Sequence, residues 1–231
     1  RRPDGVANFQ QLVGDDTNPI LKPDAAAEVK RHADLSRAGK GYPTPSNQCW
    51  PGGIPYVFWD FLVQMFQEPN QITIVYRHGN EVRRVRMNQQ HPAKVTPSWY
   101  GDSVGHYEGD TLVIDTVGIK SGPYAMLDMY GTPFSDKLHV VERYRLLDYD
   151  DAKAAMDRNA KENSFAGGGW GYDPNYRGKM LQLHFTVEDQ GVFTTPWTAT
   201  ITYRRAGHPD WQERVCAENV EKWCSSKWSN H

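Results

Sequence analysis

The chain has 231 residues, of which 39% are hydrophobic and 23% are charged, a composition typical of a globular protein with its own core. Its formal net charge of −2 and pI near 6.5 give no basic footprint, so nucleic-acid binding is not expected. No apolar run reaches the ~20 residues of a membrane-spanning helix, so no membrane span is expected either. The chain begins "RRPDG" without Met, which predicts a processed protein.

The N-terminal part predicts an extended arm followed by one helix. Residues 1–22 have no periodicity. Residues 24–38 follow Pro23, begin with Asp24 and are followed by Gly39, which are signals of a helix start and a helix end. A loop rich in Pro and Gly follows up to residue 55. We therefore expect residues 1–48 to form an N-terminal arm and helix, and residues 49–231 to form a β-barrel domain within the same folded unit.

From Phe61 to Arg205 the sequence predicts about eight antiparallel strands. Short alternating segments are separated by turn chemistry, as in "FLVQMFQ", "QITIVYR" and "EVRRVRM". Strands follow one another with few helices, which disfavours a parallel α/β sheet. The expected fold is mainly β, a single closed or nearly closed antiparallel barrel of the lipocalin or calycin type, with the N-terminal helix packed outside.

Two long excursions interrupt the strands. Residues 148–178 predict an inserted helix followed by the glycine-rich "AGGGWGYDPNYRG", and residues 118–136 form a mixed polar and apolar loop. Long connections inside a compact domain are often lids or binding loops. We therefore expect them to border a site.

Strand alternation in "KLHVVERYRL" separates two candidate catalytic residues. Glu142 falls among apolar neighbours that include Leu138 and Leu146, and His139 shares the other face with Arg143. An ionised carboxylate among apolar side chains needs a partner, and desolvation raises its pKa toward the range of a general acid or base. Two interpretations stay open for Glu142, namely a catalytic group and a buried Glu–Arg pair that holds the barrel.

The last two strands are polar on one face only. His184 lies opposite the core face formed by Leu183 and Phe185, and Trp197 lies opposite a row of threonines. A solvated sheet face explains this pattern, and so does a barrel lumen lined by a few polar groups. The second interpretation makes His184 and Arg143 candidates for ligand binding, and Trp197 is a candidate for an apolar wall of the site.

The stretch "WYGDSVGHYEGDTLVIDT" predicts a hairpin that carries one or two site residues. Its glycines and Asp110 account for the turn, which leaves His106 and the neighbouring Trp99 as candidates for a pocket mouth. "GDSVG" precedes a hairpin rather than a helix, so a serine hydrolase is not expected. No ligand spacing for a metal and no cofactor motif occurs, and we expect neither group.

The loop before His139 supplies a further candidate pair. Asp128 lies between Leu127 and Met129, so we expect the loop to fold back and to bring Asp128 and Tyr130 toward His139. A carboxylate and an imidazole in a partly desolvated mouth can divide acid and base roles. The alternative is that Asp128 caps a turn and His139 is a solvated strand residue.

An ordered set of motifs resembles a family of uncharacterised bacterial proteins that are usually exported. These motifs are "CWPGGIP", "PSWYGDSVGHYEGDTLVIDT", "LHVVERYR", "FTVEDQGVFTTPW" and "VCAEN", between Cys49 and Asn219. The resemblance implies a periplasmic or secreted β-rich protein with a Cys49–Cys216 disulfide, and Cys224 as the odd thiol. Similar proteins often have "GTPH" where this chain has "GTPF", so Phe134 replaces a histidine that could serve catalysis there.

These observations favour a protein that binds and transforms a small, largely apolar or aromatic molecule by cofactor-free acid/base chemistry of the lyase or isomerase type. The catalytic candidates are Asp128, His139, Glu142 and His106, and the candidates for substrate binding are Tyr130, Trp99, Trp197, His184 and Arg143. A non-catalytic periplasmic binding module is the main alternative, and a structural protein that uses its loops to meet another chain is a third. An oligomer is compatible with all three.

Overall fold

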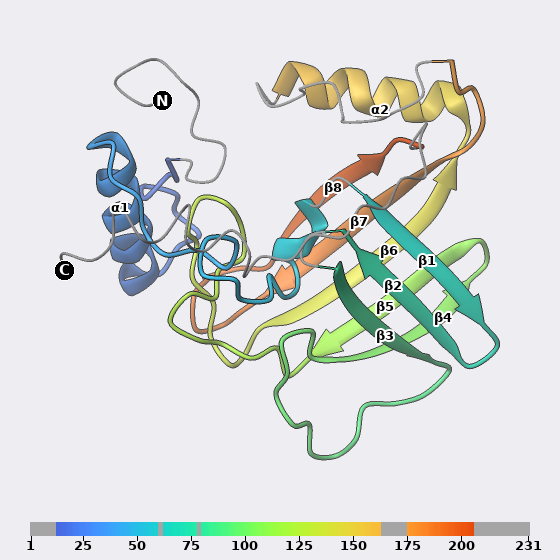
Figure 1. Cartoon of the computed structure of the whole chain (residues 1–231), viewed down its shortest axis with the longest axis horizontal. Helices are drawn as coiled ribbons and strands as arrows, with labels where there is room; N and C mark the ends of the chain where they lie inside the picture. Colours follow the sequence, from blue (N-terminus) through green and yellow to red (C-terminus); the bar gives the residue numbers. More distant parts are fainter. Residues whose placement is uncertain (1–12, 60–61, 78–79, 163–174, 206–231) are drawn as a thin grey trace.

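The computed structural model describes residues 13–59, 62–77, 80–162 and 175–205. In this part of the chain, no helix is long and apolar enough to cross a membrane. Two α-helices and eight strands make up the described fold, which is mainly β as predicted (Figure 1).

One sheet contains all eight strands in the order of the sequence, and it curls into a half-barrel (Figure 1). Strands β1 and β8 form its two edges. The strands are β1 Val63–Glu68, β2 Gln71–Tyr76, β3 Glu81–Met87, β4 Asp102–Glu108, β5 Thr111–Val117, β6 His139–Leu147, β7 Met180–Glu188 and β8 Trp197–Tyr203.

One strand pair differs from the predicted antiparallel pattern. Strands β3 and β4 pair in parallel through Arg86↔Val104 and Met87↔Gly105, whereas every other neighbouring pair is antiparallel. The connection of residues 88–101 is long enough to return the chain to the start of the next strand, as a parallel pair requires. We call residues 88–101 the crossover loop.

The concave face of the sheet carries the core. Ile74, Ile114 and Leu183 are fully buried on it, as strand alternation predicts. A short 3₁₀ helix, η1 (Tyr56–Trp59), helps to fill this face: the Phe58 ring meets the edge of Phe185 at 5.0 Å, and the Phe58 carbonyl accepts a hydrogen bond from the Tyr203 hydroxyl. The described inner face is therefore packed with side chains.

Helix α1 (Pro23–Arg37) begins at the predicted proline and lies outside the sheet (Figure 1). Its buried face contains Val29 and Ala33, and the backbone N–H of Lys22 donates to the carbonyl of Val192, which fastens the helix start to the β7–β8 connection.

Helix α2 (Tyr149–Glu162) covers the far end of the convex face, next to β7 and β8. Leu147 is buried there together with Ala152 and Met180, whereas Leu146, which alternation places on the face of Glu142, is 60% exposed. The alternation of β6 is intact, but at this end α2 covers the convex face and the concave face is open. The position of a covering helix thus decides which residue is buried.

Candidate functional site

The two faces of β6 separate the catalytic candidates. Glu142 lies on the concave face between the buried Val140 and Tyr144, and His139 and Arg143 lie on the convex face. The structure therefore places Glu142 and His139 in different networks, although they are three residues apart in sequence.

The inner network is built on Arg83 and Glu142, whose side chains are both 0% exposed. Arg83 donates to both carboxylate oxygens of Glu142, at 2.9 and 2.6 Å. Two further N–H groups of Arg83 donate to the hydroxyls of Ser103 and Thr116, and Tyr144 donates to Glu142 at 2.9 Å. Burial disfavours the charge of Arg83, but the Glu142 carboxylate raises its pKa above the usual value.

This geometry is that of the buried Glu–Arg pair, in which the Glu142 carboxylate accepts three hydrogen bonds. Arg83 was not among the residues predicted for a site. Alternation carried the signal: Arg83 shares a face with Val85 and Met87, both buried.

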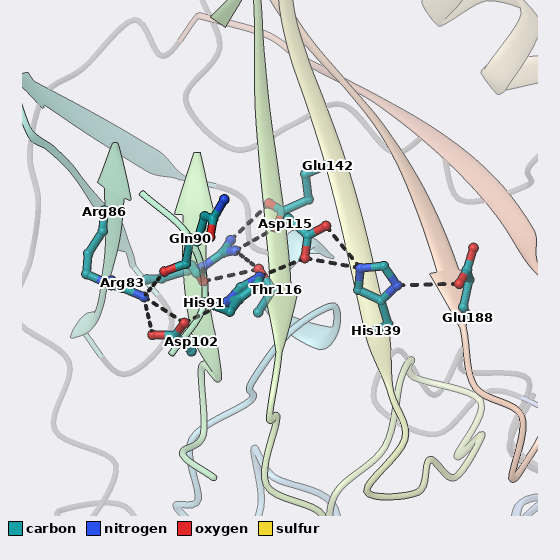
Figure 2. A network of polar contacts seen from close by, with 11 residues as sticks. Arg83, Arg86, Gln90, His91, Asp102, Asp115, Thr116, His139, Glu142 and Glu188 are labelled. Atoms are coloured by element: carbon teal, nitrogen blue, oxygen red, sulfur yellow. Dashed lines mark hydrogen bonds and ion pairs between the residues drawn. The ribbon is translucent and has the colours of Figure 1, made fainter. Parts of the chain in front are cut away.

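The outer network is a line of charged groups along the convex face (Figure 2). Arg86 donates to both oxygens of Asp102, which lies 2.7 Å from Nδ1 of His91. Asp115 then lies between two imidazoles, 3.0 Å from Nε2 of His91 and 3.1 Å from Nε2 of His139. Nδ1 of His139 ends the line, 3.4 Å from Glu188.

The carboxylate and the imidazole at the centre of this line shift each other's pKa. The hydrogen bond from His139 holds the pKa of Asp115 below its usual value, in spite of partial burial. The hydrogen bond to Asp115 raises the pKa of His139, and burial opposes that shift. His139 is therefore protonated over a wider pH range than a free histidine.

Both ring nitrogens of His91 and of His139 face carboxylates, so this network offers no free imidazole nitrogen to a substrate. A general acid or base must reach the proton that it transfers. The geometry instead ties the crossover loop, which carries His91, to β4 and β5. Neither His91 nor Asp115 was among the residues predicted for a site.

A groove opens farther along the same convex face, between α2 and strands β6, β7 and β8. Its volume is about 670 Å³. The lining consists of arginines, hydroxyl and amide groups, one histidine and two alanines: Thr111, Arg143, Arg145, Ala155, Arg158, Gln182, His184, Thr198, Ala199, Thr200 and Thr202.

Three predicted residues meet in or beside this groove. Arg143 and His184 pair across β6 and β7, and His184 Nδ1 lies 3.0 Å from the Thr200 hydroxyl. Glu108 accepts from Arg143 at 2.6 Å and also contacts His106 at 3.2 Å. These contacts, with Arg143 first, lower the pKa of Glu108.

The groove lining includes a second arginine that is held by a neutral side chain. Nε and Nη2 of Arg145 donate to the amide oxygen of Gln182, at 3.2 and 3.0 Å. Gln182 is 7% exposed, and its amide nitrogen donates to Thr202. Alternation along β6 puts Arg145 on the same face as Arg143, but its role depends on Gln182, whose proximity no motif indicated.

The remaining candidates lie apart from this groove. Asp128 accepts the backbone N–H groups of Tyr130 and Thr132, and so caps a turn. Burial raises the pKa of Asp128, while these hydrogen bonds oppose the shift. No hydrogen bond or ion pair of the described residues joins Asp128 to His139, whose nitrogens face Asp115 and Glu188.

The predicted aromatic walls are likewise dispersed. Trp197 packs edge-on against Phe185 and Phe193, and Trp99 packs edge-on against Trp50. Phe134 is partly buried against the main core. None of these three side chains lines the groove.

Cys216, the partner predicted for Cys49, lies outside the described residues, so their pairing stays a prediction. Within the described ranges, no group of three or more His, Cys, Asp or Glu side chains is arranged to hold a metal ion. The chain matches no known protein family, no curated protein and no solved structure.

Proposed function

We propose that this protein binds a small molecule in the groove between α2 and the convex face of β6–β8. The observation that carries the proposal is the contrast between the two faces of the sheet. The concave face is packed with core side chains, whereas the convex face holds a groove of about 670 Å³. Sites for small molecules commonly have volumes of about 300–1,000 Å³.

A second candidate function is acid/base conversion of the bound molecule. His184 supports it, because Nδ1 contacts the Thr200 hydroxyl and Nε2 forms no hydrogen bond with a described residue. An imidazole held by one nitrogen, with the other facing a ligand, is the usual arrangement of a general acid or base. Replacing His184 with Asn should then remove turnover of any convertible ligand while leaving its binding in place.

The proposed location is the periplasm or the outside of a bacterial cell, with Cys49 joined to Cys216. The motif resemblance supports both parts of this proposal. A disulfide between positions so far apart in sequence stabilises by ~4–5 kcal/mol in the chain-entropy model. Peptide mapping without reductant tests it: a Cys49–Cys216 peptide is expected, and a Cys216–Cys224 peptide would contradict the pairing.

Two tryptophan substitutions on adjacent residues of α2 test the site. Ala155 lines the groove and is half-buried, whereas Ala154 is exposed and does not line it. Ala155→Trp should fill the groove, and Ala154→Trp adds the same side chain outside it. The ligand panel is phenyl phosphate, phthalate, benzoate, benzyl alcohol and glucose, with binding measured by calorimetry.

Binding of at least one panel member to the wild type and to Ala154→Trp, with loss in Ala155→Trp, is the expected result. Circular dichroism of all three proteins checks that the fold is retained. If Ala155→Trp binds every ligand as well as Ala154→Trp does, or if the wild type binds none, the groove is not the site.

A further inference from the structure

The arginines of the sheet differ in what holds them. Arg83, Arg86 and Arg143 each donate to a carboxylate, namely Glu142, Asp102 and Glu108. Arg145 is held instead by the amide oxygen of Gln182. An amide fixes the guanidinium by hydrogen bonds but leaves its positive charge uncompensated.

The groove contains a second uncompensated arginine. Arg158 projects from α2 into the lining and forms no ion pair with a described residue, and its neighbour Asp157 pairs with Lys153. Among the described residues, no Asp or Glu lines the groove. Since Glu108 balances Arg143, the charges left for a ligand to neutralise are those of Arg145 and Arg158.

We propose that the groove recognises a small organic dianion, such as a phosphate monoester or a dicarboxylate. This inference rests on the proposed function and adds the chemical class of the ligand. Guanidinium groups bind carboxylate and phosphate oxygens through paired, charge-assisted hydrogen bonds. Hydroxyls of Thr198, Thr200 and Thr202 line the same groove and supply further donors.

The role of Gln182 is to hold Arg145 ready for the anion. The amide engages Nε and Nη2, and Nη1 forms no hydrogen bond with a described residue, which leaves it for the anion. Because Gln182 is nearly buried and donates to Thr202, its own position is fixed. A binding group that is already in place loses less conformational entropy when the ligand arrives.

Gln182→Glu is the sharpest test, because it replaces the amide with a carboxylate of nearly the same shape. The new carboxylate should keep hold of Arg145 and cancel its charge. We expect affinity for phenyl phosphate and phthalate to fall by about tenfold or more, the size of effect associated with one charge-assisted contact. Arg158→Gln, on an exposed helix position, should weaken the same two ligands and does not depend on the folding of Gln182→Glu.

The control variant is Arg84→Gln, which removes an equal charge from an exposed position of β3 that does not line the groove. Calorimetry of the wild type and the three variants should rank phenyl phosphate and phthalate above benzoate, and benzoate above benzyl alcohol. Inorganic phosphate alone distinguishes recognition of the free anion from recognition of its organic ester. Affinity should fall as NaCl is raised, and Arg84→Gln should bind like the wild type.

Several results would overturn the inference. If benzyl alcohol or glucose binds as tightly as phenyl phosphate and Ala155→Trp blocks that binding, the groove is the site but does not select a dianion. Unchanged affinity in both Gln182→Glu and Arg158→Gln would do the same. Tighter binding of an oligothymidylate than of phenyl phosphate would assign the arginines to a polymer instead, and a wild type that binds no ligand at all would remove the proposed function as well.

Discussion

The inner and outer networks use the same kinds of side chain in opposite surroundings. Arg83 and Glu142 are fully buried, whereas Asp115 and His139 of the outer network are about one-third exposed, at 38% and 30%. Removing one partner from a buried pair leaves an unsolvated charge, but water readily replaces a lost partner at the surface. The comparison teaches that equal hydrogen-bond distances carry unequal free energies.

The largest effect is expected for Arg83→Met, which leaves Glu142 as a buried, uncompensated carboxylate. We expect the free energy of unfolding to fall by about 3–5 kcal/mol. The matched change on the same strand, Arg86→Met, should lower it by at most about 1 kcal/mol. Urea denaturation followed by tryptophan fluorescence measures both, and equal losses would contradict the distinction between the networks.

If Arg83→Met does not fold, the double variant Arg83→Met with Glu142→Leu tests whether the uncompensated charge of Glu142 is the cause. Both charges are then absent, and apolar side chains of similar volume occupy the site. Replacement of a whole buried pair by apolar residues is often neutral. We therefore expect a folded protein with most of the wild-type stability.

A smaller effect, and one that depends on pH, is expected for Asp115→Asn. The pKa of His139 is raised in the folded state, so its pairing stabilises the fold fully below about pH 6.5 and the contribution is lost as pH rises through the raised value. The pKa of Asp115 is lowered, so its contribution is present above about pH 4 and is lost on further acidification.

The difference in unfolding free energy between wild type and Asp115→Asn should therefore be largest near pH 5–6, at about 1 kcal/mol, and should shrink toward pH 9. Urea titrations at several pH values measure it. The Arg83→Met difference provides the control, because no histidine belongs to the inner network. A difference for Asp115→Asn that grows between pH 6 and 9 would contradict the assignment of His139.

The smallest effect concerns salt. The Debye length falls from about 8 Å at physiological ionic strength to about 3 Å at 1 M, and exposed charges are screened far more than buried ones. Raising NaCl to about 1 M should therefore reduce the loss of unfolding free energy in Asp115→Asn by a few tenths of a kcal/mol. The loss in Arg83→Met should stay unchanged. A parallel reduction in both variants would show that the inner pair is not shielded from solvent.

Strand periodicity predicted which face of its own strand each candidate side chain occupies. Alternation placed Glu142 inward and His139, Arg143 and His184 outward, as the structure has them. Alternation also gives the inward position of Arg83, which shares a face with the buried Val85, although Arg83 was not among the predicted site residues. The buried Glu–Arg pair was accordingly foreseen as a possibility without its arginine.

The rest of the site depends on how strands and helices that are distant in the sequence pack together. The local sequence pattern carries little of that information. The parallel pairing of β3 with β4 decides that Arg83 faces Glu142, and nothing in residues 88–101 announces it. Likewise, the polar face of β6–β8 was expected to be a solvated surface or a lumen. The docking of α2 turned it into a groove, and the amphipathic pattern of a helix does not specify which part of a sheet it covers.

The parallel pairing also divides the sheet into two ribbons, β1–β3 and β4–β8, that share a backbone seam of only two residue pairs. Both networks bridge this seam: Arg83 reaches from β3 to β6, and Arg86 reaches from β3 to Asp102. Side-chain ion pairs therefore supplement the few backbone contacts of the short β3–β4 ladder. If the crossover loop were cut, these ion pairs would hold the two ribbons together, and the buried Arg83–Glu142 pair would be the last to break.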